Sequence, residues 1–275
     1  MKSTMHITRF RPALVAACAV ALIGFADAAC GQSTQAPAAT FEPRVGQPGK
    51  DVVWVPTPQA LVDKMLELAE VTKQDFLMDL GSGDGRTVIT AAKRGLRAQG
   101  IEYNPDMVSL AQKNATAEKV TDRASFVQAD LFQTDFSKAQ VITMFLLPSI
   151  NMKLRPTILN MRPGTRVVSN TFTMEDWQPD KSETIPDCSS WCTAHLWIVP
   201  AKVAGMWQMP QGTLTLDQQF QMVSGTLGST AISGGRLRGD AISFTVGNTV
   251  YNGRVEGNTI RGTVSGGGSF TATKR

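Results

Sequence analysis

The apolar positions between residues 51 and 200 change repeatedly from short continuous runs to helical spacing. Residues 76–78 form an apolar run, a glycine-rich turn follows, and residues 87–93 have the pattern of a helix. Residues 97–103 read as a second strand. The next helix is expected to begin at Asn104 and Pro105, since Asn is a favoured N-cap and Pro suits the first helical position. This order predicts alternating strands and helices.

The same alternation continues to about residue 200. Strands are predicted at residues 125–129, 141–147, 166–170 and 195–199. The run 141–147 is almost wholly apolar, as expected of a parallel strand covered on both faces. Residues 151–159 have a helical pattern, with Pro156 expected to break or kink the helix. The fold class predicted for residues 51–200 is therefore α/β, with a mostly parallel sheet.

A different pattern begins at residue 201. Fourteen of the 24 glycines lie in residues 201–275, and short runs there alternate strictly between apolar and polar residues. Gly-Asp and Gly-Asn pairs separate these runs, which is typical of antiparallel hairpins. We expect a small all-β module, a barrel or sandwich, that serves packing or interaction, since it carries no catalytic constellation.

The turn after the first strand carries the chemistry. Asp79 ends the strand, and Gly81, Ser82, Gly83 and Gly85 follow it. Such glycines allow a tight turn and a close approach of the backbone to a ligand, and the carboxylate suits a cationic amino-acid group. A dinucleotide site would need glycine where Arg86 stands, so a nicotinamide enzyme is the weaker alternative. The pattern D-x-G-x-G-x-G is instead typical of S-adenosylmethionine (SAM) sites.

Two more acids follow predicted strands. Glu102 ends the second strand, at a position suited to ribose hydroxyls, and Asp130 with Leu131 follows the third, where the carboxylate can meet an adenine amino group. Any one of these acids alone would be read as a helix cap or a solvated loop residue. Because the carboxyl ends of parallel strands share one edge of a sheet, the three acids together predict a SAM site.

The N-terminus resembles a cleavable export signal. Lys2, Arg9 and Arg11 precede an apolar run at residues 13–25, and small residues at 26 and 28 suit cleavage. We expect residues 1–28 to be a signal peptide, residues 29–50 a flexible linker, and the location to be periplasmic. An uncleaved membrane anchor is the alternative, and Asp27 argues against a lipid-modified Cys30. The net charge of +4 gives no strong nucleic-acid signal.

Export favours a disulfide between Cys188 and Cys192. A metal site that adds His195 is the weaker alternative, because no fourth ligand is evident, and no metal is expected. His195 itself lies in an apolar run and is interpreted as a strand residue rather than a catalytic base.

The segments 51–58, 79–86, 144–148 and 163–169 together resemble a group of bacterial class I SAM-dependent methyltransferases, which are similar to the mitochondrial lysine methyltransferase that modifies the c subunit of ATP synthase. The resemblance covers roughly residues 51–200 and implies a Rossmann-like seven-strand sheet, methyl transfer from SAM, and protein lysine as the substrate class. It implies that Pro56 and Thr57 close over the site and that Phe145, Leu146 and Pro148 line the substrate side.

The predicted function is therefore methyl transfer by in-line displacement, in a domain at residues 51–200 followed by the all-β module at 201–275. The alternative is an exported, non-enzymatic protein that binds SAM or another ligand and keeps the methyltransferase fold. Glu175 and Asp176 are weak candidates for a general base.

Overall fold

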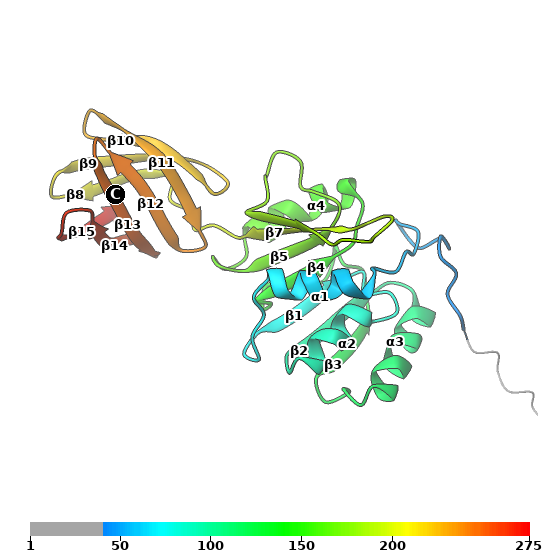
Figure 1. The fold of residues 1–275 in the computed structure, drawn as a ribbon. Coiled ribbons are helices and arrows are strands. Elements are labelled where there is room, and N and C mark those ends of the chain that lie inside the picture. Colours follow the sequence, from blue (N-terminus) through cyan, green and yellow to red (C-terminus); the bar gives the residue numbers. More distant parts are fainter. Residues whose placement is uncertain (1–40) are drawn as a thin grey trace, which may run out of the picture. The chain divides into compact units, whose positions relative to one another are not determined.

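The computed structural model describes residues 41–275 (Figure 1). The predicted signal peptide and residues 29–40 of the predicted linker lie outside the described residues. The described chain contains one seven-stranded sheet with helices and one closed barrel of eight strands.

The sheet has the strand order β3-β2-β1-β4-β5-β7-β6. All neighbours from β3 to β5 are parallel, and β7 is antiparallel to both β5 and β6. This confirms the predicted Rossmann-like methyltransferase sheet. The strands span β1 Phe76–Leu80, β2 Arg97–Glu102, β3 Ala124–Gln128, β4 Val141–Met144, β5 Arg166–Asn170, β6 Lys181–Thr184 and β7 Thr193–Ile198.

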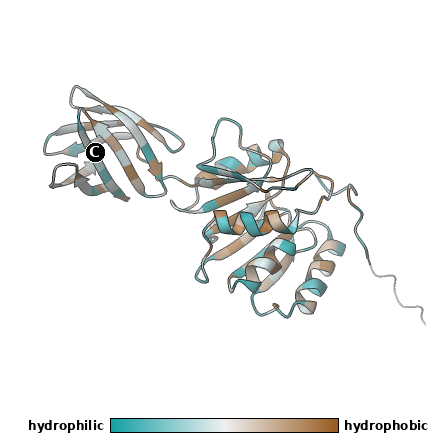
Figure 2. Cartoon of the chain, in the orientation of Figure 1, coloured by the Kyte–Doolittle hydropathy of each residue, from teal (hydrophilic) through white to brown (hydrophobic). Residues whose placement is uncertain are grey.

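Four helices accompany the sheet, namely α1 Gln59–Leu68, α2 Arg86–Lys93, α3 Pro105–Ala117 and α4 Pro148–Leu159. Apolar residues of α1, α2 and α3 share one buried cluster with Leu77, Val141 and Val168. Residues of α4 share a second cluster with the neighbouring strand positions Met78, Ile142 and Val167. Since successive strand residues point to opposite faces, the central strands are covered on both sides, and they are brown in Figure 2.

Local sequence sets the helix starts as predicted. Asn104 caps α3, because its Oδ1 accepts a hydrogen bond of 2.8 Å from the Asp106 amide, and Pro105 is the first helical residue. The expected break at Pro156 was wrong, since α4 runs through it. Ile150, Leu154 and Ile158 are buried against the sheet. Their burial offsets the one backbone hydrogen bond that Pro156, which has no amide N–H, cannot donate.

The barrel strands close in the order β10-β11-β12-β13-β14-β15-β8-β9. Their inward positions form one apolar cluster that includes Trp207, Phe244, Tyr251 and Phe270. Gly225 lies where a Cβ would be 1.9 Å from the Thr215 carbonyl oxygen, so only glycine lets β9 and β10 pair this closely. The strands span β8 Gly205–Met209, β9 Gly212–Gln219, β10 Met222–Leu227, β11 Thr230–Arg238, β12 Ala241–Val246, β13 Thr249–Glu256, β14 Thr259–Val264 and β15 Ser269–Lys274.

Of the two folds left open for the tail, the structure has the barrel. Between residues 41 and 275, no helix combines the length and the apolar character needed to cross a membrane.

Candidate active site

A cavity of about 510 Å³ lies at the carboxyl ends of β1, β2 and β4. The strand order reverses between β1 and β4, which is where open α/β sheets bind their ligands. Its volume is within the range of cofactor sites. The wall comes from segments far apart along the chain, namely residues 47–57, 81–84, 101–104, 129–131 and 144–147, together with Phe172 and Trp191.

The glycine turn forms the floor of this cavity. Gly83 has a φ of +52°, and a Cβ there would lie 2.7 Å from the Trp54 Nε1 atom. A Cβ at Gly81 would lie 3.1 Å from a methyl group of Leu146. Both positions therefore favour glycine, because a Cβ at either would press on a side chain that lines the cavity. Gly81, Ser82 and Gly83 line the cavity as expected of the turn.

Gly85, which the sequence assigned to the cofactor, is absent from the cavity wall. It precedes α2 with a φ of +84°, and a Cβ would lie 2.7 Å from the Phe126 ring and 2.9 Å from Ala111. Its contribution is to let the turn pack closely on β3 and α3.

Asp79 is buried at the base of the cavity. Its Oδ1 accepts a 2.6 Å hydrogen bond from the Thr143 hydroxyl on the neighbouring strand β4. Burial raises the pKa of Asp79 to about 7, against the lowering effect of the Thr143 hydrogen bond, and the nearby Glu102 and Asp84 add to the rise. A cationic group in the cavity would stabilise the ionised carboxylate.

Glu102 lies close to the glycine turn. Its Oε2 accepts a hydrogen bond of 2.9 Å from the Gly83 amide, and its Oε1 accepts one of 2.9 Å from the Asn104 amide. A carboxylate has about four acceptor positions, so each oxygen can still accept a ligand hydroxyl. The structure thus places Glu102 between the turn and α3, on the cavity wall.

Asp130 and Leu131 also line the cavity. The Asp130 carboxylate accepts from the Phe132 amide at 2.9 Å and forms an ion pair of 2.7 Å with Lys50. The Lys50 hydrogen bond is the main reason that the pKa of Asp130 is lowered, and the same bond raises the pKa of Lys50. The three predicted acids are therefore brought to one cavity.

A hairpin-like segment at residues 46–54, here called the cover segment, lies beside Asp130 on the cavity wall. The Gly46 amide donates to the Trp54 carbonyl at 2.8 Å, and the Trp54 amide donates to the Gln47 carbonyl at 2.9 Å. Lys50 at its turn contacts Asp130 and lies 4.6 Å from the centre of the Tyr103 ring. The sequence analysis placed residues 46–50 in the predicted linker and used residues 51–54 only for the family resemblance. It did not assign Lys50 to the site, because a lone Lys in a polar stretch carries no distinguishing signal.

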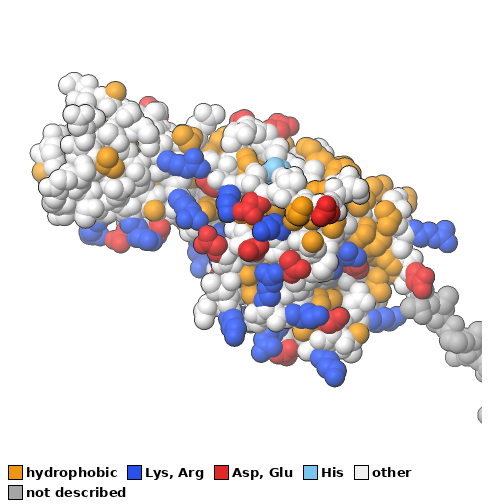
Figure 3. All heavy atoms as spheres, viewed as in Figure 1, with side chains coloured by type: hydrophobic (Ala, Val, Ile, Leu, Met, Phe, Trp, Pro, Cys, Tyr) orange, Lys and Arg blue, Asp and Glu red, His pale blue; other side chains and the backbone are white. Residues whose placement is uncertain are grey.

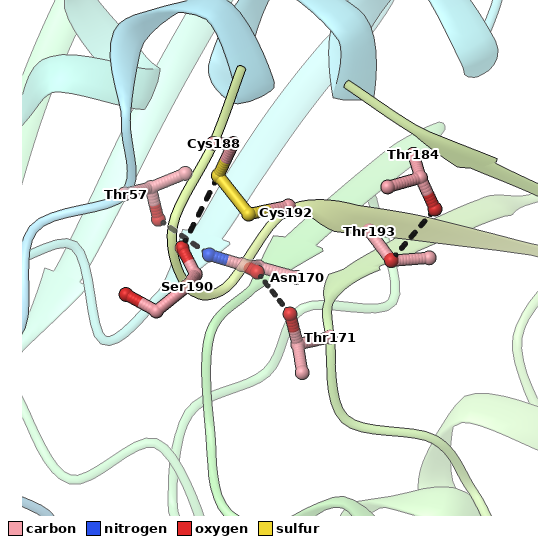
Figure 4. The surroundings of a disulfide bond; sticks show 8 residues. All are labelled: Thr57, Asn170, Thr171, Thr184, Cys188, Ser190, Cys192 and Thr193. Atoms are coloured by element: carbon pink, nitrogen blue, oxygen red, sulfur yellow. Dashed lines mark hydrogen bonds between the residues drawn. A yellow bond between two sulfur atoms is a disulfide. The ribbon is translucent and has the colours of Figure 1, made fainter. Parts of the chain in front are cut away.

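Arg86 joins the glycine turn to the segment before α1. It forms an ion pair with Asp84 at 2.6 Å and donates to the Thr57 carbonyl at 2.9 Å. The Thr57 hydroxyl in turn accepts from the Asn170 side chain at 3.3 Å (Figure 4). Pro56 and Thr57 line the cavity, where the resemblance had placed them.

The expected substrate side is partly assembled. Phe145 and Leu146 line the cavity, whereas Pro148 does not and is instead the first residue of α4. The backbone amide of the first helical residue has no hydrogen-bond partner within the helix, so proline, which lacks this amide, loses no helical hydrogen bond there. The structure adds Phe172 and Trp191, which sequence reasoning did not assign to the site. An isolated aromatic residue in a loop gives no sign of the cavity that it will reach.

The weak base candidates are not part of the cavity wall. Glu175 and Asp176 are absent from it, and Asp176 forms an ion pair with Arg155. His195 lies in β7 with Nδ1 2.8 Å from the Ser182 hydroxyl and Nε2 3.1 Å from the Thr171 carbonyl oxygen. Nε2 must carry the proton because a carbonyl only accepts, and burial lowers the pKa of His195. His195 is a neutral strand residue.

Cys188 and Cys192 form a disulfide with a Cα–Cα distance of 5.8 Å (Figure 4). The bonded pair closes the loop between β6 and β7 that carries Trp191. In the part of the chain that the structure describes, no three His, Cys, Asp or Glu side chains are grouped as metal ligands would be.

The mouth of the cavity is apolar. Of the eight large hydrophobic side chains exposed among residues 41–275, four line the cavity, namely Val53, Tyr103, Leu147 and Trp191. Figure 3 shows orange side chains gathered beside the point where the described chain begins, with few charges among them. Apolar groups grouped in this way are typical of interaction sites.

Comparison with known proteins agrees with this geometry. Residues 79–181 match a family model described as the ANTKMT methyltransferase domain. A crystal structure of an RNA methyltransferase from Salinibacter ruber, in complex with S-adenosyl-L-homocysteine, is 48% identical, with a TM-score of 0.51 and coverage of 54% of this chain and 96% of that one. The fold and the cavity define a SAM-dependent methyltransferase.

A protein-lysine N-methyltransferase of Saccharolobus islandicus is 41% identical over 151 residues, which are 54% of this chain and 94% of that protein. The chain belongs to the ANTKMT methyltransferase-domain family. The Homo sapiens lysine N-methyltransferase named for the c subunit of ATP synthase is 31% identical over 128 residues. Those residues are 46% of this chain and 54% of the human protein, so the match spans about half of that relative.

The residues present fit SAM. The backbone of the glycine turn lines the cavity at positions where a Cβ would crowd the wall, a buried carboxylate lies at the base, and two more carboxylates line the same cavity. Asp79 and the turn would hold the amino-acid end, Glu102 the ribose and Asp130 the adenine. When bound, SAM would supply an electrophilic methyl group for transfer to an acceptor. The cavity would hold the two reactants in a fixed orientation.

Proposed function

We propose that this methyltransferase acts on the side-chain amine of lysine in a protein. The observation that carries the proposal is the charge of the cavity. Among the described residues that line it, five are acids and two are bases. Both bases, Lys50 and Arg86, form ion pairs with acids of the same cavity. Such a cavity favours a cationic side chain over the phosphates of a nucleic acid.

The apolar mouth supports the same proposal. Val53, Tyr103, Leu147 and Trp191 are 38% to 56% exposed around the opening. A polypeptide can cover such a surface with apolar side chains, whereas a nucleic acid needs Lys and Arg along its backbone path. The sequence likeness to the protein-lysine N-methyltransferase of Saccharolobus islandicus points in the same direction.

A nucleophilic amine must be neutral, so the lysine ammonium has to lose a proton before methyl transfer. The acids that line the cavity favour entry of the ammonium, and the proton passes to water at the open mouth. After transfer the product nitrogen carries a positive charge, and it must release another proton before it can accept a second methyl group. Within the described chain, we assign no side chain as the general base.

The second candidate acceptor is RNA, since the similar structure from Salinibacter ruber is described as an RNA methyltransferase. One experiment separates the two. The purified chain is incubated with an extract of its host and SAM labelled in the methyl group, and the product is divided between protease and ribonuclease. Label released by protease and recovered as methyllysine is expected. Label released by ribonuclease would show that the methyl acceptor is RNA rather than protein lysine. Absence of any label would favour a protein that binds SAM without methylating an acceptor.

We also propose that the enzyme is exported to the periplasm, on the basis of the basic and apolar N-terminal pattern and the pair Cys188 and Cys192. In this arrangement residues 1–28 are removed, residues 51–200 form the catalytic domain, and residues 201–275 are a separate packing or interaction module. An uncleaved N-terminus would instead anchor the enzyme to the membrane.

A further inference from the structure

Three aromatic rings meet on the wall of the cavity. Phe145 follows β4, Phe172 follows β5, and Trp191 lies in the disulfide-closed loop before β7. The ring centroids are 5.9 Å apart for Phe145 and Phe172, 5.7 Å for Phe145 and Trp191, and 5.3 Å for Phe172 and Trp191. All three line the cavity. At these separations the rings pack against one another, so a ligand can meet only the sides that line the cavity. We propose that these cavity-lining sides of the three rings, here called the cage, bind the alkylammonium group of the methyl acceptor, an inference that rests on the lysine function proposed above.

The cage differs from the aromatic residues of the core. Trp177, Trp197 and Trp207 are fully buried, whereas Trp191 is 38% exposed and both phenylalanines are half-buried. Trp191 therefore keeps part of its indole open to a ligand in the cavity. The face of an aromatic ring carries negative potential and attracts a cation within about 6 Å.

The charges around the cage favour the same ligand. Asp51 lines the cavity together with the rings and, unlike Asp79, Glu102 and Asp130, is not assigned to SAM. A ring trio alone would also accept an uncharged apolar group, but a carboxylate in the same cavity favours a cation. In addition, the acceptor nitrogen becomes positively charged during transfer, so the rings stabilise the transition state more than the neutral amine.

The disulfide acts as a positioning element for Trp191. The loop of residues 188–192 is closed by the bond, and Trp191 has a φ of +59°, which is uncommon for a residue with a side chain. The adjacent Cys192 carbonyl accepts from the Ile185 amide at 3.0 Å, and the Thr184 and Thr193 hydroxyls lie 2.9 Å apart (Figure 4). These contacts leave the loop few conformations, so the indole is held toward Phe172.

The test uses n-butylammonium as the probe and 1-pentanol as its uncharged counterpart. Each is titrated into the full chain saturated with S-adenosylhomocysteine, and the indole N–H signals are followed by two-dimensional NMR. The Trp191 signal is assigned from the Trp191→Phe variant. We expect n-butylammonium to shift this signal with an affinity at least about tenfold higher than that of 1-pentanol. Equal affinities, or no shift with either compound, would overturn the cage.

Two variants sharpen the test. Phe172→Leu removes one ring, and Cys188→Ser with Cys192→Ser releases the loop. Both should weaken n-butylammonium binding by about fivefold or more, while the affinity for S-adenosylhomocysteine changes less than twofold. A general loss of stability would weaken the binding of both ligands. Met222→Ala, at an exposed apolar residue of β10, is the matched control and should change neither. Unchanged ammonium binding in Phe172→Leu would refute the proposal.

The outcomes separate the cage from the lysine function. If the labelled product in the extract is RNA while n-butylammonium still binds at Trp191, the lysine proposal fails and the cation site stands. If methyllysine is formed but n-butylammonium has no effect, the cage fails and the lysine function stands.

Discussion

The indole of Trp54 lies against Gly83, where a Cβ would come within 2.7 Å of its Nε1 atom. The contact joins the cover segment to the glycine turn, although α1 and β1 lie between the two along the chain. At Gly83 the backbone therefore contacts the Trp54 indole and also lines the cavity.

The first prediction follows from this contact. Gly83→Ala should weaken binding of S-adenosylhomocysteine at least about tenfold, because the new methyl group displaces Trp54 and narrows the cavity. Isothermal titration calorimetry measures the affinity. Gly164→Ala is the control, since Gly164 also has a positive φ, of +89°, but a Cβ there meets nothing within 4 Å. Equal losses in the two variants would mean that backbone strain, rather than the contact with Trp54, is responsible.

The second prediction concerns the ion pair of Lys50 and Asp130. Lys50→Met should speed the release of S-adenosylhomocysteine a few-fold, because the cover segment loses its contact with Asp130. Stopped-flow fluorescence measures the rate, and the effect should shrink at high salt, which screens an exposed ion pair. The control is Lys93→Met, which removes an equally short exposed pair with Glu118 at 2.6 Å and should leave the release rate unchanged. A release rate unaffected by Lys50→Met would contradict a covering role for the segment.

The third prediction is a pH dependence of stability. The pKa of Asp79 is about 7 in the folded protein, whereas an unfolded chain has the ordinary value near 3.8. The folded state therefore binds more protons between these values, and the free energy of unfolding should fall as the pH rises from about 4 to 7. The contribution is at most about 4 kcal/mol, from about 1.4 kcal/mol for each unit of pKa.

Denaturant unfolding of the ligand-free protein at a series of pH values measures this effect. Asp79→Asn should flatten the slope between pH 4 and 7, since an amide does not titrate. Asp122→Asn, at an exposed carboxylate beside Arg123, should keep the slope of the unmodified chain. A slope that survives in Asp79→Asn would assign the titration to another group.

The fourth prediction tests export through the disulfide. Protein taken from the native host, with thiols blocked at lysis, should show Cys188 and Cys192 joined and residues 1–28 absent in mass spectrometry. Reduction should lower the free energy of unfolding by at most about 2 kcal/mol, because a loop of this length removes little entropy from the unfolded chain. Alkylated thiols on a chain that still begins at residue 1 would argue against the exported location.

The sequence alone determined the local elements around the site. The glycine turn, the cap at Asn104 and the alternation of strands and helices are set by φ angles, capping side chains and apolar spacing within a few residues. The same local logic put Asp79, Glu102 and Asp130 at strand ends, so their meeting in one cavity needed only the rule that parallel strands end together.

Only the tertiary structure decided which distant segments complete that cavity. Lys50 and Trp54 reach it through the cover segment, and Trp191 meets Phe145 and Phe172 because antiparallel β7 pairs with β5. Gly85 was assigned to the cofactor by the glycine motif, and Pro148 to the substrate side by the family resemblance. In the structure Gly85 packs on β3 and α3, and Pro148 begins α4. The physical reason is that the spacing of apolar residues along the chain reports only whether each position is buried. Which residues line a cavity depends on the order in which the strands pair across the sheet.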